Sequence, residues 1–394
     1  MKLRYERFGA WVKLDEPPAV VALDRDGVRA LGKDGGDHWR DDAPPTPPIE
    51  VHLAVTQRCG AGCEGCYLDA RPDGLEPPLE VLLARMDALA EAGVMTVAFG
   101  GGEPVTRDDL GVLADAARTR GLTPVLTTSG LGLSAARVAR LGLQGFAQVN
   151  VSYDGGAEAY AQVRGFDGAH AAEAAITLLS QSGVRVGVNV VLTSATLAAL
   201  PETLRRARAI GASEAQLLRY KPAGRAASLD YLARRLTPEQ VLAFPAMLRA
   251  LSVEHAPAGF SIRIDCSMVP FLAGDPALYA SPELLVRAGI FGCEGGQALA
   301  SVKVDGHVAP CSFVPTTALL AEGLVRDHQH DPDLTRWRAY PSTAPEPCAS
   351  CAIASVCKGG CKAVSTFVDG VHGPDPECPR VRAHRADGAR GAPS

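Results

Sequence analysis

The feature that most constrains this chain is a run of three cysteines, Cys59, Cys63 and Cys66, with the spacing C-x3-C-x2-C. They lie in a glycine-rich loop directly after a short apolar, strand-like segment. Three thiolates at this spacing can bind three irons of one 4Fe-4S cluster, which leaves the fourth iron without a protein ligand. Structural zinc is the alternative, but it usually takes four ligands in two short pairs, and the loop offers no fourth Cys or His. We therefore favour an iron-sulfur cluster with one open iron.

Composition places these thiols in a reducing compartment. The chain has eleven cysteines in 394 residues, no apolar run long enough to span a membrane, and no secretory signal at its start. In such a context cysteines indicate metal ligation and not disulfides, so we expect a cytoplasmic protein without a membrane partner. The net charge of -5 is mild and gives no reason to expect a nucleic-acid partner.

From residue 50 to residue 220, six short apolar segments alternate with amphipathic helical patterns. Repeated beta-alpha units predict an α/β fold in which a parallel sheet curls into a partial (β/α)6 TIM-like barrel. The active site of such a barrel collects at the C-terminal ends of its strands. The cysteine loop follows the first predicted strand, so it lies where that rule places a functional loop.

Two further strand ends carry polar residues. The second strand runs into Gly101, Gly102 and Glu103, where glycines let the backbone approach a ligand and the carboxylate can hold an ammonium group. On the fourth strand, period-two alternation puts Ser152 and Asp154 on the polar face, and Asn189 on the fifth strand is a weaker candidate. The alternatives are a plain strand-to-helix turn and a solvated strand end.

Seven more cysteines return after residue 290. They are spaced as Cys293-x17-Cys311, with Gly306 five residues before the second, then Cys348-x2-Cys351-x5-Cys357-x3-Cys361, and finally Cys378. A zinc ribbon could account for four of these thiols but not for all seven.

The first cysteine run resembles the signature of radical S-adenosylmethionine (SAM) enzymes, and the second pattern resembles the SPASM extension of that superfamily. The resemblance covers about residues 50 to 380. It implies that SAM chelates the open iron and is split by one electron into a 5'-deoxyadenosyl radical. It also implies that Gly101, Gly102 and Glu103 bind the amino group of SAM.

The same resemblance assigns Ser152 and Asp154 to the ribose or methionyl part of SAM, with Asn189 as a further candidate. The residue before the third cysteine, which usually packs on adenine, is Gly65 here. Tyr67 is the candidate to replace it.

The SPASM pattern implies two auxiliary iron-sulfur clusters of the 4Fe-4S type. The family topology assigns four thiols to the outer cluster, namely Cys348, Cys351, Cys357 and Cys378. It leaves Cys293, Cys311 and Cys361 for the inner one. The fully ligated version has another cysteine soon after the first, and residues 294–300 contain none. Either this cluster has an open iron, or a non-cysteine group or Cys266 completes it.

Cys266 is the one thiol that these assignments leave over. Free cysteines are often buried and inert. We favour that interpretation over a role as a cluster ligand or as a catalytic hydrogen donor.

The expected organisation is an N-terminal β-hairpin and linker (1–48), a radical SAM core (49–227), a helical bridge (228–290), a SPASM domain (291–380) and a flexible tail (381–394). Residues 1–31 alternate polar and apolar twice and then give way to a proline-rich stretch. We favour a hairpin that caps the barrel over a module that binds a leader peptide.

The resemblance implies an enzyme that modifies a ribosomally made peptide or protein by crosslinking, oxidation or epimerisation. One alternative is a radical SAM enzyme that acts on a small molecule such as a tetrapyrrole, in haem-type maturation. Another is a multi-cluster electron carrier, but a carrier needs no SAM site such as Gly101 to Glu103. The implied partners are the peptide or protein substrate, with or without a separate leader-recognition protein, and an electron donor such as flavodoxin or ferredoxin.

Overall fold

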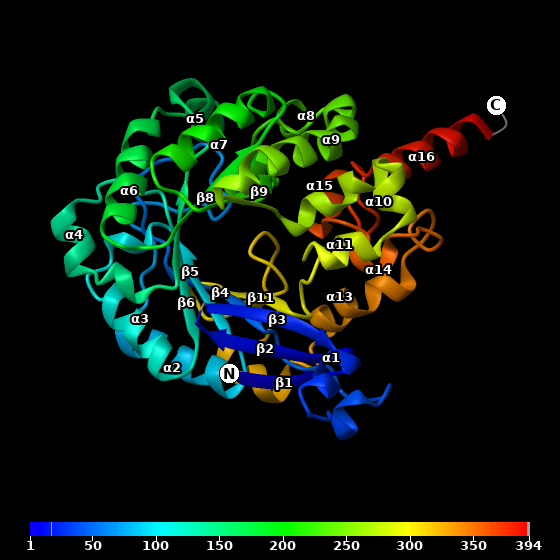
Figure 1. Ribbon diagram of the computed structural model, residues 1–394, viewed down its shortest axis with the longest axis horizontal. Helices are drawn as coiled ribbons and strands as arrows, with labels where there is room; N and C mark the ends of the chain where they lie inside the picture. The colour runs from blue at the N-terminus through cyan, green and yellow to red at the C-terminus, as the bar shows by residue number, and fades with distance from the viewer. Residues whose placement is uncertain (17, 392–394) are drawn as a thin grey trace.

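A curved nine-stranded sheet with helices on its outer face forms the centre of the molecule (Figure 1). The computed structural model describes residues 1–16 and 18–391. Six parallel strands follow one another in chain order across the sheet. They are β4 (Glu50–Thr56), β5 (Thr96–Gly101), β6 (Thr123–Thr128), β7 (Gln148–Ser152), β8 (Val186–Leu192) and β9 (Glu214–Arg219). This is the partial barrel that the alternating segments predicted.

Helices connect these strands along the chain and pack on the outer face of the sheet. They are α2 (Leu79–Glu91), α3 (Leu110–Thr119), α4 (Ala135–Arg140), α5 (Ala157–Arg164), α6 (Ala169–Gln181) and α7 (Leu200–Ala209). In α2 the buried residues Leu82, Met86 and Leu89 recur at helical spacing and form one apolar face. In β7, Val149 and Val151 are fully buried, whereas the residues between them are only partly buried. Alternate side chains of the strands therefore face the barrel interior, and there they are polar.

Both ends of this sheet are extended by strands from later in the chain. β10 (Ser261–Ile264) pairs in parallel with β9, and β11 (Leu299–Val302) pairs in parallel with β4. β12 (Val308–Ala309) then pairs antiparallel with β11. Unpaired edge strands expose a row of backbone donors and acceptors, and these additions satisfy β4 and β9. The expected bridge and C-terminal region therefore share one sheet with the barrel.

The remaining helices surround the cysteine-rich end of the molecule. Between β9 and β11 they are α8 (Tyr231–Arg234), α9 (Pro238–His255), the 3-10 helix η7 (Cys266–Gly274), α10 (Pro276–Ala280) and α11 (Glu283–Arg287). After β12 they are α12 (Leu324–Asp327), α13 (Pro332–Thr343), α14 (Ala354–Cys357), α15 (Lys362–Asp369) and α16 (Pro379–Gly391).

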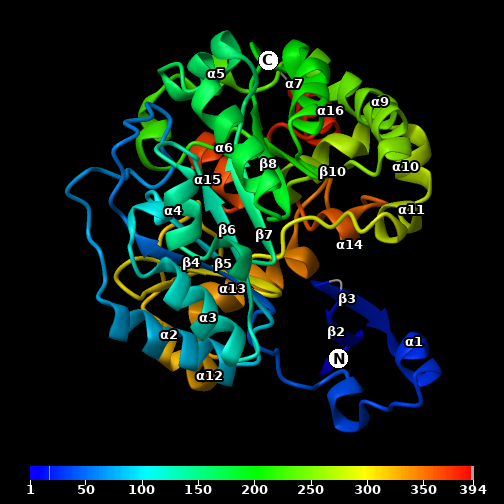
Figure 2. The same ribbon diagram turned by 60° about the vertical axis from the view of Figure 1, so that its left-hand side comes forward.

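The N-terminal segment is a three-stranded antiparallel sheet, where a hairpin was expected. β1 (Lys2–Glu6), β2 (Gly9–Asp15) and β3 (Pro18–Asp24) are followed by the short helix α1 (Arg25–Ala30), and this unit projects from the barrel in Figure 2. The first alternating stretch holds two strands because the chain turns at residues 7 and 8. Gly9 is required there, since a Cβ at this position would lie 2.0 Å from the Leu23 carbonyl oxygen.

This sheet contacts the N-terminal end of the barrel. Arg4 Nη1 donates to the Gly93 carbonyl at 3.2 Å, and Lys13 Nζ donates to the Gly121 carbonyl at 2.6 Å. Gly93 and Gly121 lie in the loops that enter β5 and β6. The N-terminal sheet is therefore at the opposite end of the barrel from the cysteine loop.

The C-terminal end differs from the expected flexible tail. Residues 381–391 continue α16, and residues 392–394 lie outside the described part of the chain. Val381 is buried, and the Arg385 guanidinium pairs with Asp369 at 2.6 Å, so side-chain contacts hold the start of this helix in place. No helix in residues 1–16 and 18–391 combines the length and apolar character needed to cross a membrane.

Candidate active site

The first cysteine run lies at the C-terminal end of β4 and is held from behind by Arg225. The Arg225 guanidinium donates to the Cys63 carbonyl at 3.0 Å, and its backbone N–H donates to the Cys66 carbonyl at 2.9 Å. Gly224, at φ +55°, permits this approach because a Cβ would lie 2.5 Å from the Tyr67 backbone. The loop conformation is thus fixed by a contact with the segment that follows β9.

The three thiols of this loop are partly buried and close together. Burial raises the pKa of Cys59, and the nearby Cys63 and Cys66 thiols raise it further. The Ala70 amide donates to the Cys66 sulfur at 3.4 Å, a type of contact that cluster sulfurs commonly receive.

In residues 1–16 and 18–391, no three His, Cys, Asp or Glu side chains converge as ligands of a single metal ion would. Each cysteine of a 4Fe-4S cluster binds its own iron, so its thiols surround a cluster instead of one point. The ligand assignments stay predictions.

Gly101 and Gly102 pack directly against the start of the cysteine loop. The Gly102 amide donates to the Thr56 carbonyl at 2.7 Å, and the Glu103 amide donates to the Arg58 carbonyl at 2.8 Å. A Cβ at Gly101 or Gly102 would lie 2.1 or 2.2 Å from one of these carbonyl oxygens. Only glycine allows this approach, which places Glu103 beside the first cysteine.

The Glu103 carboxylate is buried and has no cationic partner. It accepts hydrogen bonds from the Thr128 hydroxyl at 2.6 Å and the Ser129 amide at 2.8 Å, and also from the Ser129 hydroxyl. No lysine or arginine in the described part of the chain forms an ion pair with it. Burial raises its pKa, and it lies within electrostatic range of the Cys59 thiol. A ligand ammonium group would supply the missing positive charge.

Ser152, the last residue of β7, pairs in register with Asn189 in the middle of β8. The Asn189 Oδ1 atom is buried and, within the described residues, has no hydrogen-bond partner. An orphaned acceptor on the interior face of a barrel is suited to a ligand hydroxyl or amine. This observation, together with Glu103, fits the SAM site that the sequence predicted.

Asp154 is buried. The alternative to a contact with SAM was that Asp154 is a solvent-exposed residue at the end of a strand, and its burial disagrees with that alternative. Its Oδ2 accepts from Arg164 Nε at 2.6 Å, and its Oδ1 accepts from the Val191 amide at 2.8 Å. The Arg164 guanidinium also lies close to Cys63, where it opposes the effect of burial in raising the pKa of that thiol. Asp154 therefore positions Arg164 beside the cysteine loop, and its predicted contact with SAM remains a prediction.

Tyr67 joins the cysteine loop to the C-terminal region. Its ring centroid lies 4.6 Å from that of Phe313, in the loop after β12. Phe313 in turn receives Lys221 Nζ at 4.2 Å from its ring centroid, and its amide donates to the Cys311 sulfur at 3.5 Å. Tyr67, the residue proposed to pack on adenine, therefore lies beside the loop that carries Cys311.

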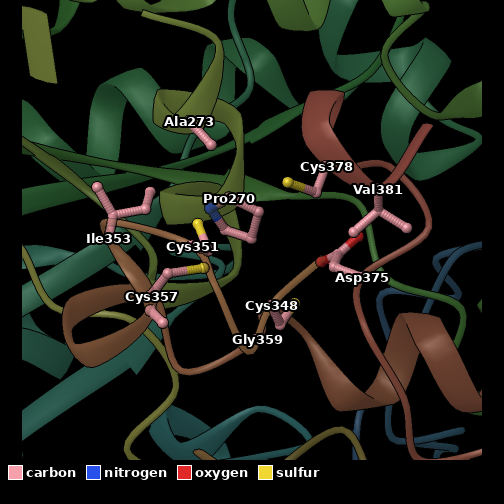
Figure 3. Close-up of a pocket in the computed structure, with 11 residues that line it drawn as sticks. Pro270, Ala273, Cys348, Cys351, Ile353, Cys357, Gly359, Asp375, Cys378 and Val381 are labelled. Carbon is pink, nitrogen blue, oxygen red and sulfur yellow. The ribbon is translucent and has the colours of Figure 1, made fainter. Parts of the chain in front are cut away.

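The four thiols assigned to the outer cluster line one pocket (Figure 3). The sulfur atoms of Cys351, Cys357 and Cys378 point into it from α14 and from the turn before α16. Its other lining residues include Asp375 and Pro270. Burial raises the pKa of Cys378 to about 12, so that an iron must displace the thiol proton when it binds.

Cys266, which the sequence offered as one possible fourth ligand, lies near two of the three thiols predicted for the inner group. Cys293 lies within electrostatic range of Cys311 and Cys361, and burial raises the pKa of Cys361 to about 11. Cys266 lies within the same range of Cys293 and Cys311. It is only half-buried, and its role stays a prediction.

Several residues of the site were not identified from the sequence. Thr128 and Ser129 hold Glu103, Arg164 and Arg225 hold the cysteine loop, and Lys221 faces Phe313. Thr128 and Ser129 belong to a Thr-Ser-Gly tripeptide at the end of β6, but that short pattern does not indicate Glu103 as their partner. The arginines and Lys221 carry no sequence signal because their partners are far away in the chain.

Together, the barrel, the cysteine loop and the buried Glu103 form the arrangement that the sequence predicted for a radical SAM site. Residues 53–207 match the model of the Radical SAM superfamily. The predicted class, a radical SAM enzyme with a C-terminal SPASM region, agrees with this match and with relatives that align with 84 and 85% of the chain.

The chain is 28% identical over 358 residues to PqqA peptide cyclase of Gluconobacter oxydans (strain 621H), covering 85% of this chain and 91% of that protein. It is 29% identical over 349 residues to mycofactocin maturase MftC of Mycolicibacterium smegmatis, covering 84% and 82%. It is 26% identical over 334 residues to AdoMet-dependent heme synthase of Oleidesulfovibrio alaskensis, covering 81% and 83%.

Among solved structures, the fold is similar to that of Streptococcus suis SuiB bound to S-adenosylmethionine. The TM-score is 0.72 at 14% identity, with 95% of this chain and 98% of SuiB covered. The likeness supports the barrel and its C-terminal extension as one fold.

Proposed function

We propose that this chain is a radical SAM maturase whose substrate is a peptide or a protein. The observation that carries the proposal is its similarity, over 85% of its length, to a peptide cyclase. The match extends well beyond residues 53–207, so it includes the cysteine-rich region that borders the barrel mouth. A peptide cyclase and a mycofactocin maturase are thus relatives that align with most of this chain.

The described residues support specific roles toward SAM and its cluster. Cys59, Cys63 and Cys66 would hold the cluster, and the Glu103 carboxylate would accept the SAM ammonium. Ser152 and Asn189 would contact the ribose or methionyl part of SAM, because they are paired neighbours on β7 and β8. When bound, the cluster and SAM supply a 5'-deoxyadenosyl radical that removes a hydrogen atom from the substrate.

Residues between the first cysteine loop and the inner cysteines would form the substrate side of the site. Tyr67 and Phe313 stack at the boundary, and Lys221 pairs with the Asp265 carboxylate behind them. The Lys221 ammonium is buried, so it can orient a carbonyl or carboxylate of a peptide only if part of this wall opens to the substrate.

The auxiliary clusters, the electron donor and the location belong to the same proposal. The outer cysteines line one pocket, which supports a cluster there, and an external donor such as flavodoxin or ferredoxin would reduce the SAM cluster. Eleven thiols without disulfides support a reducing, cytoplasmic location. Whether the N-terminal sheet or a separate protein binds a leader segment stays open.

A tetrapyrrole substrate is the second candidate, because AdoMet-dependent heme synthase is also a relative at 26% identity. Two of the relatives described above are a peptide cyclase and a peptide-type maturase, and both are slightly more identical to this chain. The genes beside this one discriminate the candidates. A short cysteine-, serine- or aromatic-rich open reading frame favours a peptide, and haem-pathway genes favour a tetrapyrrole.

The test is deuterium transfer. The reconstituted enzyme is incubated without oxygen with SAM, reductant and the candidate precursor peptide carrying deuterated side chains. We expect 5'-deoxyadenosine to gain deuterium and the peptide to change mass. Deuterium transfer from a tetrapyrrole precursor and none from the peptide would contradict the proposed substrate class. Absence of 5'-deoxyadenosine under all conditions would contradict the SAM chemistry itself.

A further inference from the structure

We infer that Cys266 is the fourth protein ligand of the inner auxiliary cluster, together with Cys293, Cys311 and Cys361. The inference rests on the proposed function, because it presupposes that this cluster exists. Cys266, at the start of η7 and just after β10, would take the place of the cysteine that residues 294–300 lack.

The residue before Cys266 connects it to the Cys311 loop. Asp265 forms a buried ion pair with Lys221. Lys221 Nζ lies over the Phe313 ring at 4.2 Å, and the Phe313 amide donates to the Cys311 sulfur at 3.5 Å. The end of β10 is therefore tied to the loop that carries Cys311 by three consecutive contacts.

The residue after Cys266 connects it to the loop that carries Cys361. The Ser267 carbonyl accepts from Arg219 Nη1 at 3.1 Å, and the same guanidinium pairs with Asp375 at 2.6 Å. Asp375 Oδ2 accepts from the Cys361 amide at 2.9 Å. Cys266 is thus held on both sides, by one neighbour toward Cys311 and by the other toward Cys361.

Cys266 lies in the same region as these thiols, because both of its neighbours are linked to the segments that carry them. Asp265, Ser267 and Met268 are buried, whereas Cys266 between them is only half-buried. The Cys293 and Cys311 thiols lie within electrostatic range of it.

Ligation by four cysteines changes what the inner cluster can do. The Cys266 thiol releases its proton when the sulfur binds iron, and all four irons then have a protein ligand. No iron remains for a substrate thiolate. The inner cluster would therefore transfer electrons and would not bind the substrate directly.

The experiment isolates the auxiliary clusters. Cys59, Cys63 and Cys66 are changed to Ala, so that about eight irons in two 4Fe-4S clusters are expected to remain. In this background Cys266→Ala, Cys266→Ser and the neighbouring control Ser267→Ala are reconstituted without oxygen. Iron content, the electron paramagnetic resonance spectrum of the reduced protein, and its response to 2-mercaptoethanol are measured.

We expect the parent and Ser267→Ala to keep about eight irons, and we expect their spectra to be unchanged by the added thiol. Cys266→Ala should fall to about four irons, or should keep the inner cluster with a changed spectrum that now responds to thiol. Cys266→Ser should shift the signal of one cluster, because an oxygen replaces a sulfur ligand while the side-chain volume is nearly retained.

Unchanged iron, spectrum and thiol response in both Cys266 variants would overturn the inference. So would a parent protein whose inner cluster already responds to thiol, since that cluster would have an open iron. A parent with only about four irons would overturn the assignment of two auxiliary clusters as well. That iron content distinguishes a failure of the cluster assignment from a failure of the Cys266 inference alone. Deuterium transfer in the unmodified enzyme does not depend on any of these outcomes.

Discussion

Arg219, the last residue of β9, donates to both carboxylate oxygens of Asp375, at 2.6 and 3.0 Å, although 156 residues separate them in the chain. An oxygen of a second carboxylate, Glu377 Oε2, lies 2.8 Å from the same guanidinium. Asp375 lines the outer cysteine pocket and also accepts from the Cys361 amide. The end of a barrel strand therefore supports both groups of C-terminal cysteines through one buried cation.

Removing that cation should destabilise the protein strongly. Arg219→Met leaves the buried Asp375 carboxylate without its ion pair, while Glu377 keeps Arg235 at 3.5 Å. Breaking a buried pair in this way costs about 3 to 5 kcal/mol in free energy of unfolding. Iron from the auxiliary clusters should fall while SAM-cluster iron is retained. The control Arg336→Met removes a largely exposed partner of Asp333 and should change the free energy of unfolding by less than about 1 kcal/mol. Equal stability of the two variants would contradict the role of Arg219.

The iron content tests the cysteine assignments as a set. The ten cysteines that the sequence assigned as ligands imply about twelve irons in three 4Fe-4S clusters after anaerobic reconstitution, whether or not Cys266 is a further ligand. Changing Cys59, Cys63 and Cys66 together to Ala should remove about four irons and all SAM cleavage, because the open iron is in that cluster. Metal analysis and 5'-deoxyadenosine assays measure both. Zinc in place of iron would refute the cluster interpretation.

Glu103 should contribute to SAM affinity through its charge. Glu103→Gln keeps the shape of the side chain but removes the charge that an ammonium would pair with. SAM binding should weaken by about 1.5 to 3 kcal/mol, the range of a hydrogen bond to a charged group, while the iron content is unchanged. Equilibrium binding of SAM to the reconstituted protein measures this. Glu202→Gln, on the exposed face of α7, is the matched control, and identical affinities in the two variants would mean that Gly101 to Glu103 form only a turn.

Buried histidines should make the fold sensitive to mild acid. Burial and the nearby Arg338 lower the pKa of His328 to about 4. An unfolded chain titrates near its ordinary value of about 6.5, so between these two values the unfolded state binds more protons. Stability is therefore full above about pH 6.5 and is lost as the pH falls toward 4. At pH 5.5, the contribution of His328 to this loss should be about 1 kcal/mol.

Urea unfolding of the wild type and of His328→Gln, at pH 7.5 and 5.5 without oxygen, measures that contribution. The variant should lose less stability between the two values than the wild type does. His372, whose pKa burial also lowers to about 4, should still contribute in both proteins. A pH dependence that is the same with and without His328 would contradict the prediction.

Much of the fold could be predicted because its signals are local. Apolar alternation located the six barrel strands, and the α2 pattern located its buried face, since each depends on neighbours within one or two turns of chain. The N-terminal segment was predicted less well. Its first alternating stretch contains two strands, because a turn at residues 7 and 8 does not interrupt the alternation.

The sequence by itself determined the chemistry of the main site. The decisive patterns are short: the spacing of Cys59, Cys63 and Cys66 within one loop, and the glycines before Glu103. Each directly follows a predicted strand, so its position at the C-terminal end of that strand follows from the local sequence. Only the tertiary structure decided what surrounds them. The pairing of Arg219 with Asp375, the stacking of Tyr67 on Phe313 and the position of Cys266 beside Cys293 and Cys311 join residues far apart in the chain. Such contacts depend on how β10 and β11 extend the two edges of the barrel sheet, and no local pattern of residues encodes that pairing.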